Sequence, residues 1–148
     1  MLKDVTADLN GILAAHAEVQ AALSFIIASP LLGRETLSAV LGEVSEHVIA
    51  RFIGGAREAR GNNGYDLRGP ANEKIEVKAR QLSRYGANLK FDFSKHSAAA
   101  DEAFCITWND EMSPPVIYAA FRATIPAMLE RWGTPEQARY SIRTDLRR

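Results

Sequence analysis

The chain of 148 residues is 47% hydrophobic and 24% charged, with 18 Lys and Arg against 18 Asp and Glu. This length can bury a sizeable core in one domain, and the composition excludes a disordered, collagen-like or coiled-coil chain. No apolar run approaches the roughly 18 residues needed to span a bilayer, and the polar start of the chain lacks the pattern of a signal peptide. We therefore expect a cytoplasmic protein with no membrane partner.

The first third of the chain predicts an N-terminal helical pair. Residues 5–28 are Ala-rich, with apolar residues at mainly helical spacing, and the pattern stops before Pro30. Residues 34–52 carry a second apolar stripe that ends at Gly54 and Gly55, which are typical of a left-handed helix terminus.

The rest of the chain predicts a sheet. Residues 65–69 and 73–81 are extended stretches separated by turn residues, and they indicate a β-hairpin. Three further strands are expected at residues 89–93, at the apolar run 104–108 and at 116–121, with a short helix over 97–103 and another helix over 125–132. The tail beyond these elements carries no pattern that indicates a helix or a strand.

This order of elements fits an α/β or an α+β fold, and we expect the α/β class, with a central mixed β-sheet flanked by helices. We expect a single domain over residues 1–148, in which residues 1–33 form a helical extension. The single cysteine, Cys105, lies in the apolar run 104–108 and is expected to be a buried thiol.

The balanced total charge hides an uneven distribution. Residues 1–50 carry two basic and six acidic side chains, residues 51–96 carry ten and five, and residues 97–148 carry six and seven. The basic excess of the middle segment fits attraction to a phosphate backbone, and a solvated surface is the alternative interpretation.

Two carboxylates of the predicted hairpin are expected to share one face. Between residues 75 and 80, apolar residues alternate with Glu76, Lys78 and Arg80, so those three side chains project together. Asp66 on the preceding strand faces the same side if the hairpin registers about its turn. Neighbouring carboxylates repel unless a cation lies between them, and Mg²⁺ binds such oxygen atoms while keeping positions open for water and phosphate. Lys78 is then placed to orient an attacking water or to neutralise charge on the phosphate.

The ordered set of Asp66, Glu76, Val77 and Lys78 resembles the motif of the PD-(D/E)XK nuclease superfamily, whose members share the restriction-endonuclease-like fold. The resemblance extends over about residues 40–96. It implies that Asp66, Glu76 and the main-chain carbonyl of Val77 bind Mg²⁺, with Mn²⁺ as a substitute. It further implies that Lys78 acts in water activation.

Many members of this superfamily add a glutamate from the helix before the hairpin, and the resemblance aligns Glu46 with that residue. Glu43 is the competing candidate. At about 100° per residue, Glu46 shares a second apolar stripe with Ile49, whereas Glu43 lies nearer the polar side. We therefore expect Glu46 to be catalytic, together with the three polar hairpin residues. Tyr65 departs from the motif, because it stands where the family name places Pro.

The resemblance implies a Mg²⁺-dependent DNA endonuclease that hydrolyses phosphodiester bonds with a metal-activated water, in restriction or genome defence. A homodimer is expected, because cutting both strands usually requires two such sites. Basic side chains expected to contact DNA phosphates, with a solvated surface as the alternative, are Arg80, Arg84, Lys90 and Lys95. The alternative function is a catalytically inactive module of the nuclease fold that binds DNA or another partner. The histidines His16, His47 and His96 show no zinc spacing and are expected to be structural or surface residues.

Overall fold

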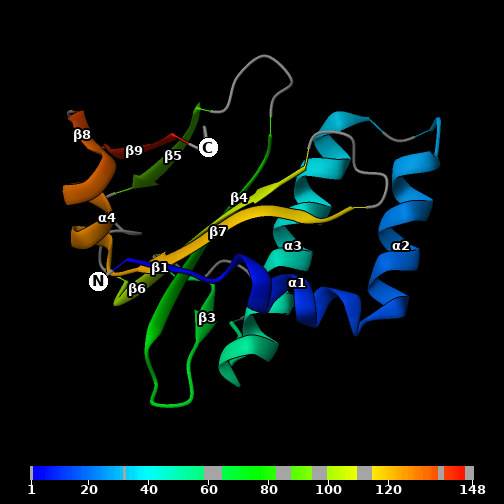
Figure 1. Cartoon of the computed structure of the whole chain (residues 1–148), viewed down its shortest axis with the longest axis horizontal. Coiled ribbons are helices and arrows are strands. Elements are labelled where there is room, and N and C mark those ends of the chain that lie inside the picture. The colour runs from blue at the N-terminus through cyan, green and yellow to red at the C-terminus, as the bar shows by residue number, and fades with distance from the viewer. Residues whose placement is uncertain are drawn as a thin grey trace.

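A six-stranded mixed sheet forms the centre of the molecule in this computed structural model (Figure 1). The structure describes residues 2–31, 33–58, 65–82, 88–94, 100–109, 115–136 and 139–145. The strands lie in the order β1 (Lys3–Asp4), β7 (Ile117–Ala123), β6 (Glu102–Trp108), β4 (Lys74–Gln81), β3 (Leu67–Arg68) and β2 (Ala56–Arg57). The β4 and β6 strands are parallel, and all other neighbours are antiparallel. The predicted α/β class, with a mixed sheet flanked by helices, is confirmed.

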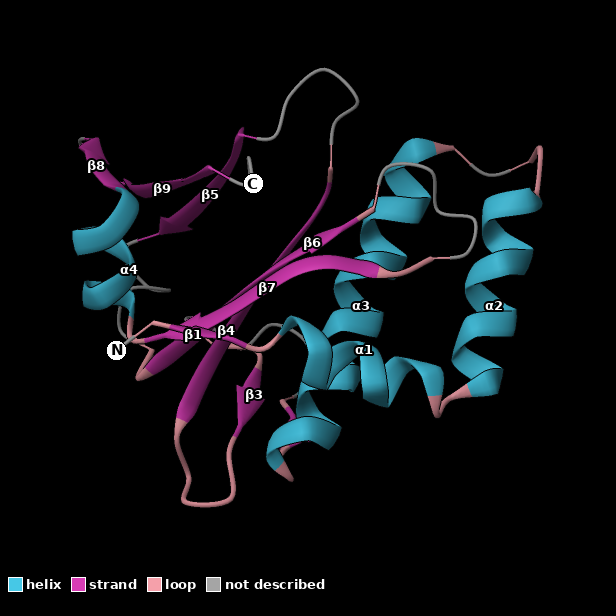
Figure 2. Cartoon of the chain, viewed as in Figure 1, coloured by secondary structure: helices cyan, strands magenta, loops and turns pink. Residues whose placement is uncertain are grey.

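Two helices, α1 (Thr6–Ala14) and α3 (Arg34–Ile53), pack on one face of this sheet, and α2 (Ala17–Ala28) packs against those two helices (Figure 2). The prediction of α3 is confirmed, and the helix ends at Gly54, whose φ of 70° is the left-handed conformation expected there. The prediction of one helix over residues 5–28 is wrong, because the chain bends by 91° between α1 and α2. A straight helix over that range would be about 36 Å long, whereas the bend lets both halves pack against α3.

No single helix within the described ranges is long and apolar enough to cross a membrane. Among the same residues, the bent pair of α1 and α2, taken together, has the length and composition of a span.

A second, three-stranded sheet lies on the other side of the central sheet, in the order β5 (Asn88–Ser94), β9 (Arg139–Asp145) and β8 (Gly133–Glu136). The strand predicted at residues 89–93 is therefore real, but its expected place in the central sheet is wrong. Its partner is β9, from the tail for which the sequence predicted no element. The predicted helix at residues 125–132 is confirmed as α4 (Ile125–Trp132).

The chain enters β6 directly beside the start of β4. The N–H of Asp101 donates to the carbonyl of Lys74, and the N–H of Lys74 donates to the Asp101 carboxylate, both at 2.8 Å. Glu102 and Ala103 already belong to β6, so the short helix predicted over 97–103 is wrong for its last residues. Residues 97–99 lie outside the described part of the chain.

The central strands divide the core into two apolar clusters. Ile75 and Val77 of β4 pack with the helices on one face, whereas Ala103 and Cys105 of β6 pack with α4 on the other. Cys105 is buried, as predicted. This alternation fixes which β4 side chains are left to project away from the helices.

Candidate functional site

The predicted β-hairpin is confirmed, and its turn places Asp66 beside β4. Leu67 pairs with Ile75 and Arg68 with Lys74, across a turn in which Asn72 has a φ of 68°. Asn tolerates this left-handed conformation better than most residues do. The paired residues end at Leu67 and Ile75, so the position of Asp66 opposite Glu76 stays a prediction.

Backbone pairing between β3 and β4 stops at Asp66, and beyond this point the Asp66 side chain accepts a hydrogen bond from β4. The N–H of Asp66 donates to the carbonyl of Ile75 at 2.8 Å. The N–H of Val77 then donates to Oδ2 of Asp66, also at 2.8 Å. The Asp66 carboxylate therefore accepts the hydrogen bond of a β4 N–H group that has no backbone acceptor on β3. This contact fixes the orientation of Asp66.

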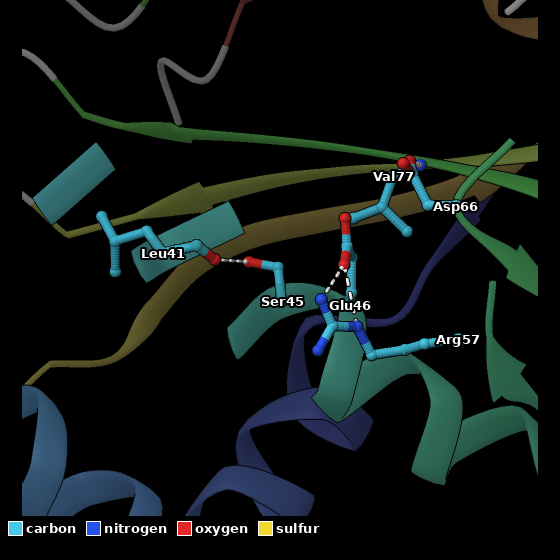
Figure 3. A network of polar contacts seen from close by, with 6 residues as sticks. All are labelled: Leu41, Ser45, Glu46, Arg57, Asp66 and Val77. Atoms are coloured by element: carbon cyan, nitrogen blue, oxygen red, sulfur yellow. Dashed lines mark hydrogen bonds and ion pairs between the residues drawn. The ribbon is translucent and has the colours of Figure 1, made fainter. Parts of the chain in front are cut away.

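Glu46 reaches this region from α3. Its side chain is 20% exposed, and its Oε2 accepts from Nε of Arg57 at 3.0 Å and lies 2.9 Å from a second guanidinium nitrogen. Figure 3 shows this pair together with Asp66 and Val77. Burial, then the negative charge of Asp66, raises the pKa of Glu46, and the nearby Arg57 opposes the shift. Glu46 and Asp66 are therefore electrostatic neighbours, and Glu43, which is exposed, makes the smallest of the contributions that raise the pKa of Glu46.

Arg57 was missed by the sequence analysis. It lies on β2, which follows α3 after Gly54 and Gly55. A Cβ at Gly55 would collide with the carbonyl oxygen of Arg68, so only glycine allows β2 to approach β3 here. The tight reversal carries Arg57 back over the last turns of α3. The glycine pair is the sequence signal that could have indicated this return, although it does not identify the acidic partner.

Glu76 and Lys78 form a second pair on β4. The carboxylate of Glu76 is 8% exposed, and its Oε1 lies 3.7 Å from Nζ of Lys78, whose side chain is 30% exposed. Both alternate with the residues that pack on the helices, so they belong to the opposite face of the sheet. Cys105 stands directly beside Lys78 in the parallel ladder. Burial raises the pKa of Cys105, the charge of Lys78 opposes this shift, and the charge of Glu76 adds to it. A charged pair thus lies at the border of the second apolar cluster.

The four predicted catalytic residues surround Val77 from two directions. Asp66 binds the main-chain N–H of Val77 and interacts with Glu46, while Glu76 and Lys78 flank Val77 along the strand. Within the described ranges, no three His, Cys, Asp or Glu side chains are grouped so that they could hold a metal ion. The ligand set that the resemblance implies, two carboxylates and one carbonyl, is smaller than such a group.

Of the four basic residues expected to contact DNA, only one has a described side chain. Arg80 is exposed on β4. Lys90 lies on β5, but its side chain is outside the described part of the structure, as are Arg84 and Lys95.

Two further cations lie against Tyr65, the residue that departs from the family motif. The guanidinium of Arg68 is 5.0 Å and the ammonium of Lys74 is 5.7 Å from the centre of its ring. Arg68 also donates to the Tyr65 hydroxyl and pairs with Glu58. Tyr65 therefore ties the first strand of the hairpin to basic side chains next to Asp66.

No protein-family model and no curated protein matches this chain.

Proposed function

We propose that the chain is a Mg²⁺-dependent endodeoxyribonuclease of the PD-(D/E)XK type. The observation that supports this most is the arrangement about Val77, where Asp66 binds the strand edge between Glu76 and Lys78. The hydrogen bond from the backbone N–H of Val77 is sufficient to orient the Asp66 carboxylate where strand pairing ends. The helical Glu46, interacting with Asp66, completes the set expected from the sequence.

The donor atoms at this position fit a hard divalent cation. Asp66, Glu76 and the carbonyl of Val77 supply oxygen, which Mg²⁺ prefers. The repulsion between Glu46 and Asp66 contributes to the raised pKa of Glu46, and a cation nearby would relieve it. When bound, Mg²⁺ polarises a phosphate and lowers the pKa of its water. The chain itself contributes the orientation of Asp66 and the ammonium of Lys78, which neutralises charge on a phosphate or holds a water.

Plasmid cleavage tests this proposal. Purified protein is incubated with supercoiled DNA in Mg²⁺, in Mn²⁺ and in chelator, alongside Asp66→Asn, Glu76→Gln and Lys78→Ala. Each variant should lower the cleavage rate by roughly 100-fold or more, because each alters transition-state electrostatics. Glu43→Gln is the matched control on α3, since Glu43 is exposed, and it should cleave more nearly like the wild type than Glu46→Gln. Wild-type rates in all three hairpin variants would reject the site.

A DNA-binding module without turnover is the second candidate, and the contact between Arg57 and Glu46 favours it. The chain's own guanidinium already neutralises this carboxylate. Such a module should retard DNA in a gel in a salt-dependent way, yet leave the plasmid intact under every metal condition.

Restriction or genome defence, and a homodimer that presents two sites to the two strands, belong to the first proposal. Light scattering of the protein with a short DNA duplex measures the number of chains bound and so tests the homodimer directly. Two chains per duplex are expected, and one chain per duplex with both strands cut would contradict it.

A further inference from the structure

A groove separates α2 from α3 on the helical side of the molecule, away from the carboxylates described above. Its volume is about 370 Å³. The walls carry Val19 and Leu23 from α2, and Val40 and Val44 from α3. Leu23 is fully buried and the three valines are partly buried, so the groove has an apolar floor.

One end of the groove gathers hydrogen-bond donors from two distant parts of the sequence. His16 lies at the break between α1 and α2, and its ring centre is 5.7 Å from that of His47 on α3, at 70° between planes. Arg51 stands one helical turn after His47 and also lines the groove. Among the described residues, none of these three side chains has a hydrogen-bond or ion-pair partner.

A metal ion is not the ligand that this end favours. Glu18 lines the groove with the two histidines, yet no described set of three such side chains is grouped for metal binding. The guanidinium of Arg51 adds a fixed positive charge, which repels cations and attracts an anion. Glu18 in turn disfavours a polyanion such as nucleic acid. A single, compact negative charge is therefore the best complement.

We propose that this groove binds a small amphiphilic carboxylate. Its head accepts hydrogen bonds from His16, His47 and Arg51, and its hydrocarbon body lies along the valine-lined walls. At about 30 Å³ for each water-sized group, the groove holds on the order of a dozen non-hydrogen atoms. An apolar pocket with a few convergent polar groups is the usual form of a small-molecule site.

Octanoate is a probe of suitable size. Acetate keeps only its carboxylate head, and octan-1-ol keeps its hydrocarbon body without the charge. Calorimetric titration of the full chain should show saturable octanoate binding, and each partial probe should bind at least about tenfold more weakly. In a parallel NMR titration, the ring signals of His16 and His47 should shift with the same affinity.

Two exposed donors of the groove provide the variants. Arg51→Gln and His47→Gln should each weaken octanoate binding by about threefold to tenfold, since a charge-assisted hydrogen bond at a partly solvated site is lost. Glu43→Gln, on the same helix but outside the lining, is the control and should bind as the wild type does. All three variants are expected to keep the plasmid-cleavage behaviour of the wild type.

Several outcomes would overturn the proposal. These are no octanoate binding at up to about 10 mM, octan-1-ol binding as tight as that of octanoate, or equal affinity in the wild type and both donor variants. None of these outcomes bears on the nuclease site, because Asp66 and the β4 residues do not line the groove.

Discussion

The two edges of β4 differ in what satisfies their backbone. On the edge toward β6, all seven residues from Ile75 to Gln81 pair in register. On the edge toward β3, pairing covers Lys74 and Ile75, after which the Asp66 carboxylate accepts from Val77. A continuous backbone ladder leaves no room for a ligand. At the other edge the hydrogen-bond acceptor changes from backbone to a carboxylate, so charged oxygen atoms are available to a ligand. The first edge therefore serves stability, and the second is the edge at which we propose that the chemistry takes place.

The largest expected effect is a difference in the free energy of unfolding between substitutions at these two edges. Ile106 on β6 is fully buried, so Ile106→Ala should lower the free energy of unfolding by about 2–5 kcal/mol. Asp66→Asn should change it by less than about 1 kcal/mol, because the amide oxygen still accepts from Val77. Urea unfolding measures both. Equal losses would mean that Asp66 is a structural residue and that the two edges do not differ.

The second prediction concerns the effect of Mg²⁺ on stability at the β4 edge that faces Asp66. A native-state site with a Kd of about 1 mM at about 10 mM Mg²⁺ adds roughly 1.4 kcal/mol of stability. For a chain of this size, that raises Tm by roughly 3–6 °C. Asp66→Asn should melt no lower than the wild type in chelator, because a repulsion with Glu46 is removed, and Mg²⁺ should shift it little.

Thermal melts of both proteins in chelator and in Mg²⁺ give the comparison. An equal shift in wild type and Asp66→Asn would place the metal elsewhere. A shift in neither protein would support the binding module.

The third prediction follows from the raised pKa of Glu46 relative to its ordinary value of 4.5. Between the unfolded and the folded pKa, the native state binds more protons than the unfolded state, so stability falls as pH rises through this interval. Glu46→Gln removes that fall. The free energy of unfolding of the variant, minus that of the wild type, should therefore increase from about pH 4 to pH 7.

Two neighbouring variants sharpen this test. Asp66→Asn should lower the pKa of Glu46 and Arg57→Gln should raise it, as NMR titration of the Glu46 carboxyl would show. Movement of the pKa in the opposite direction in either variant would contradict the electrostatic assignment.

The smallest expected effect concerns DNA at the exposed end of β4. Arg80→Ala should reduce the slope of log affinity against log salt by about one counterion. Lys3→Ala, exposed on β1 at the opposite side of the sheet order, should leave the slope unchanged. Equal slopes for Arg80→Ala and the wild type would show that Arg80 does not contact phosphate.

Local patterns were sufficient where neighbouring residues decide the structure. The alternation about Val77 and the turn between Arg68 and Lys74 predicted the hairpin, because a strand has a period of two and a turn needs particular residues. The α3 helix, its glycine end and the inward position of Glu46 followed from helical periodicity. These interactions act over a few residues, so the sequence by itself determines them.

Long-range partners were decided only by the tertiary structure. Whether residues 89–93 join the central sheet depends on the competing edge that β9 offers, and the bend after α1 depends on where α3 lies. Arg57 meets Glu46, and His16 meets His47, across separations for which no periodicity applies. A contact between distant segments forms when packing the apolar faces brings them together, so the pattern of one segment alone cannot specify it.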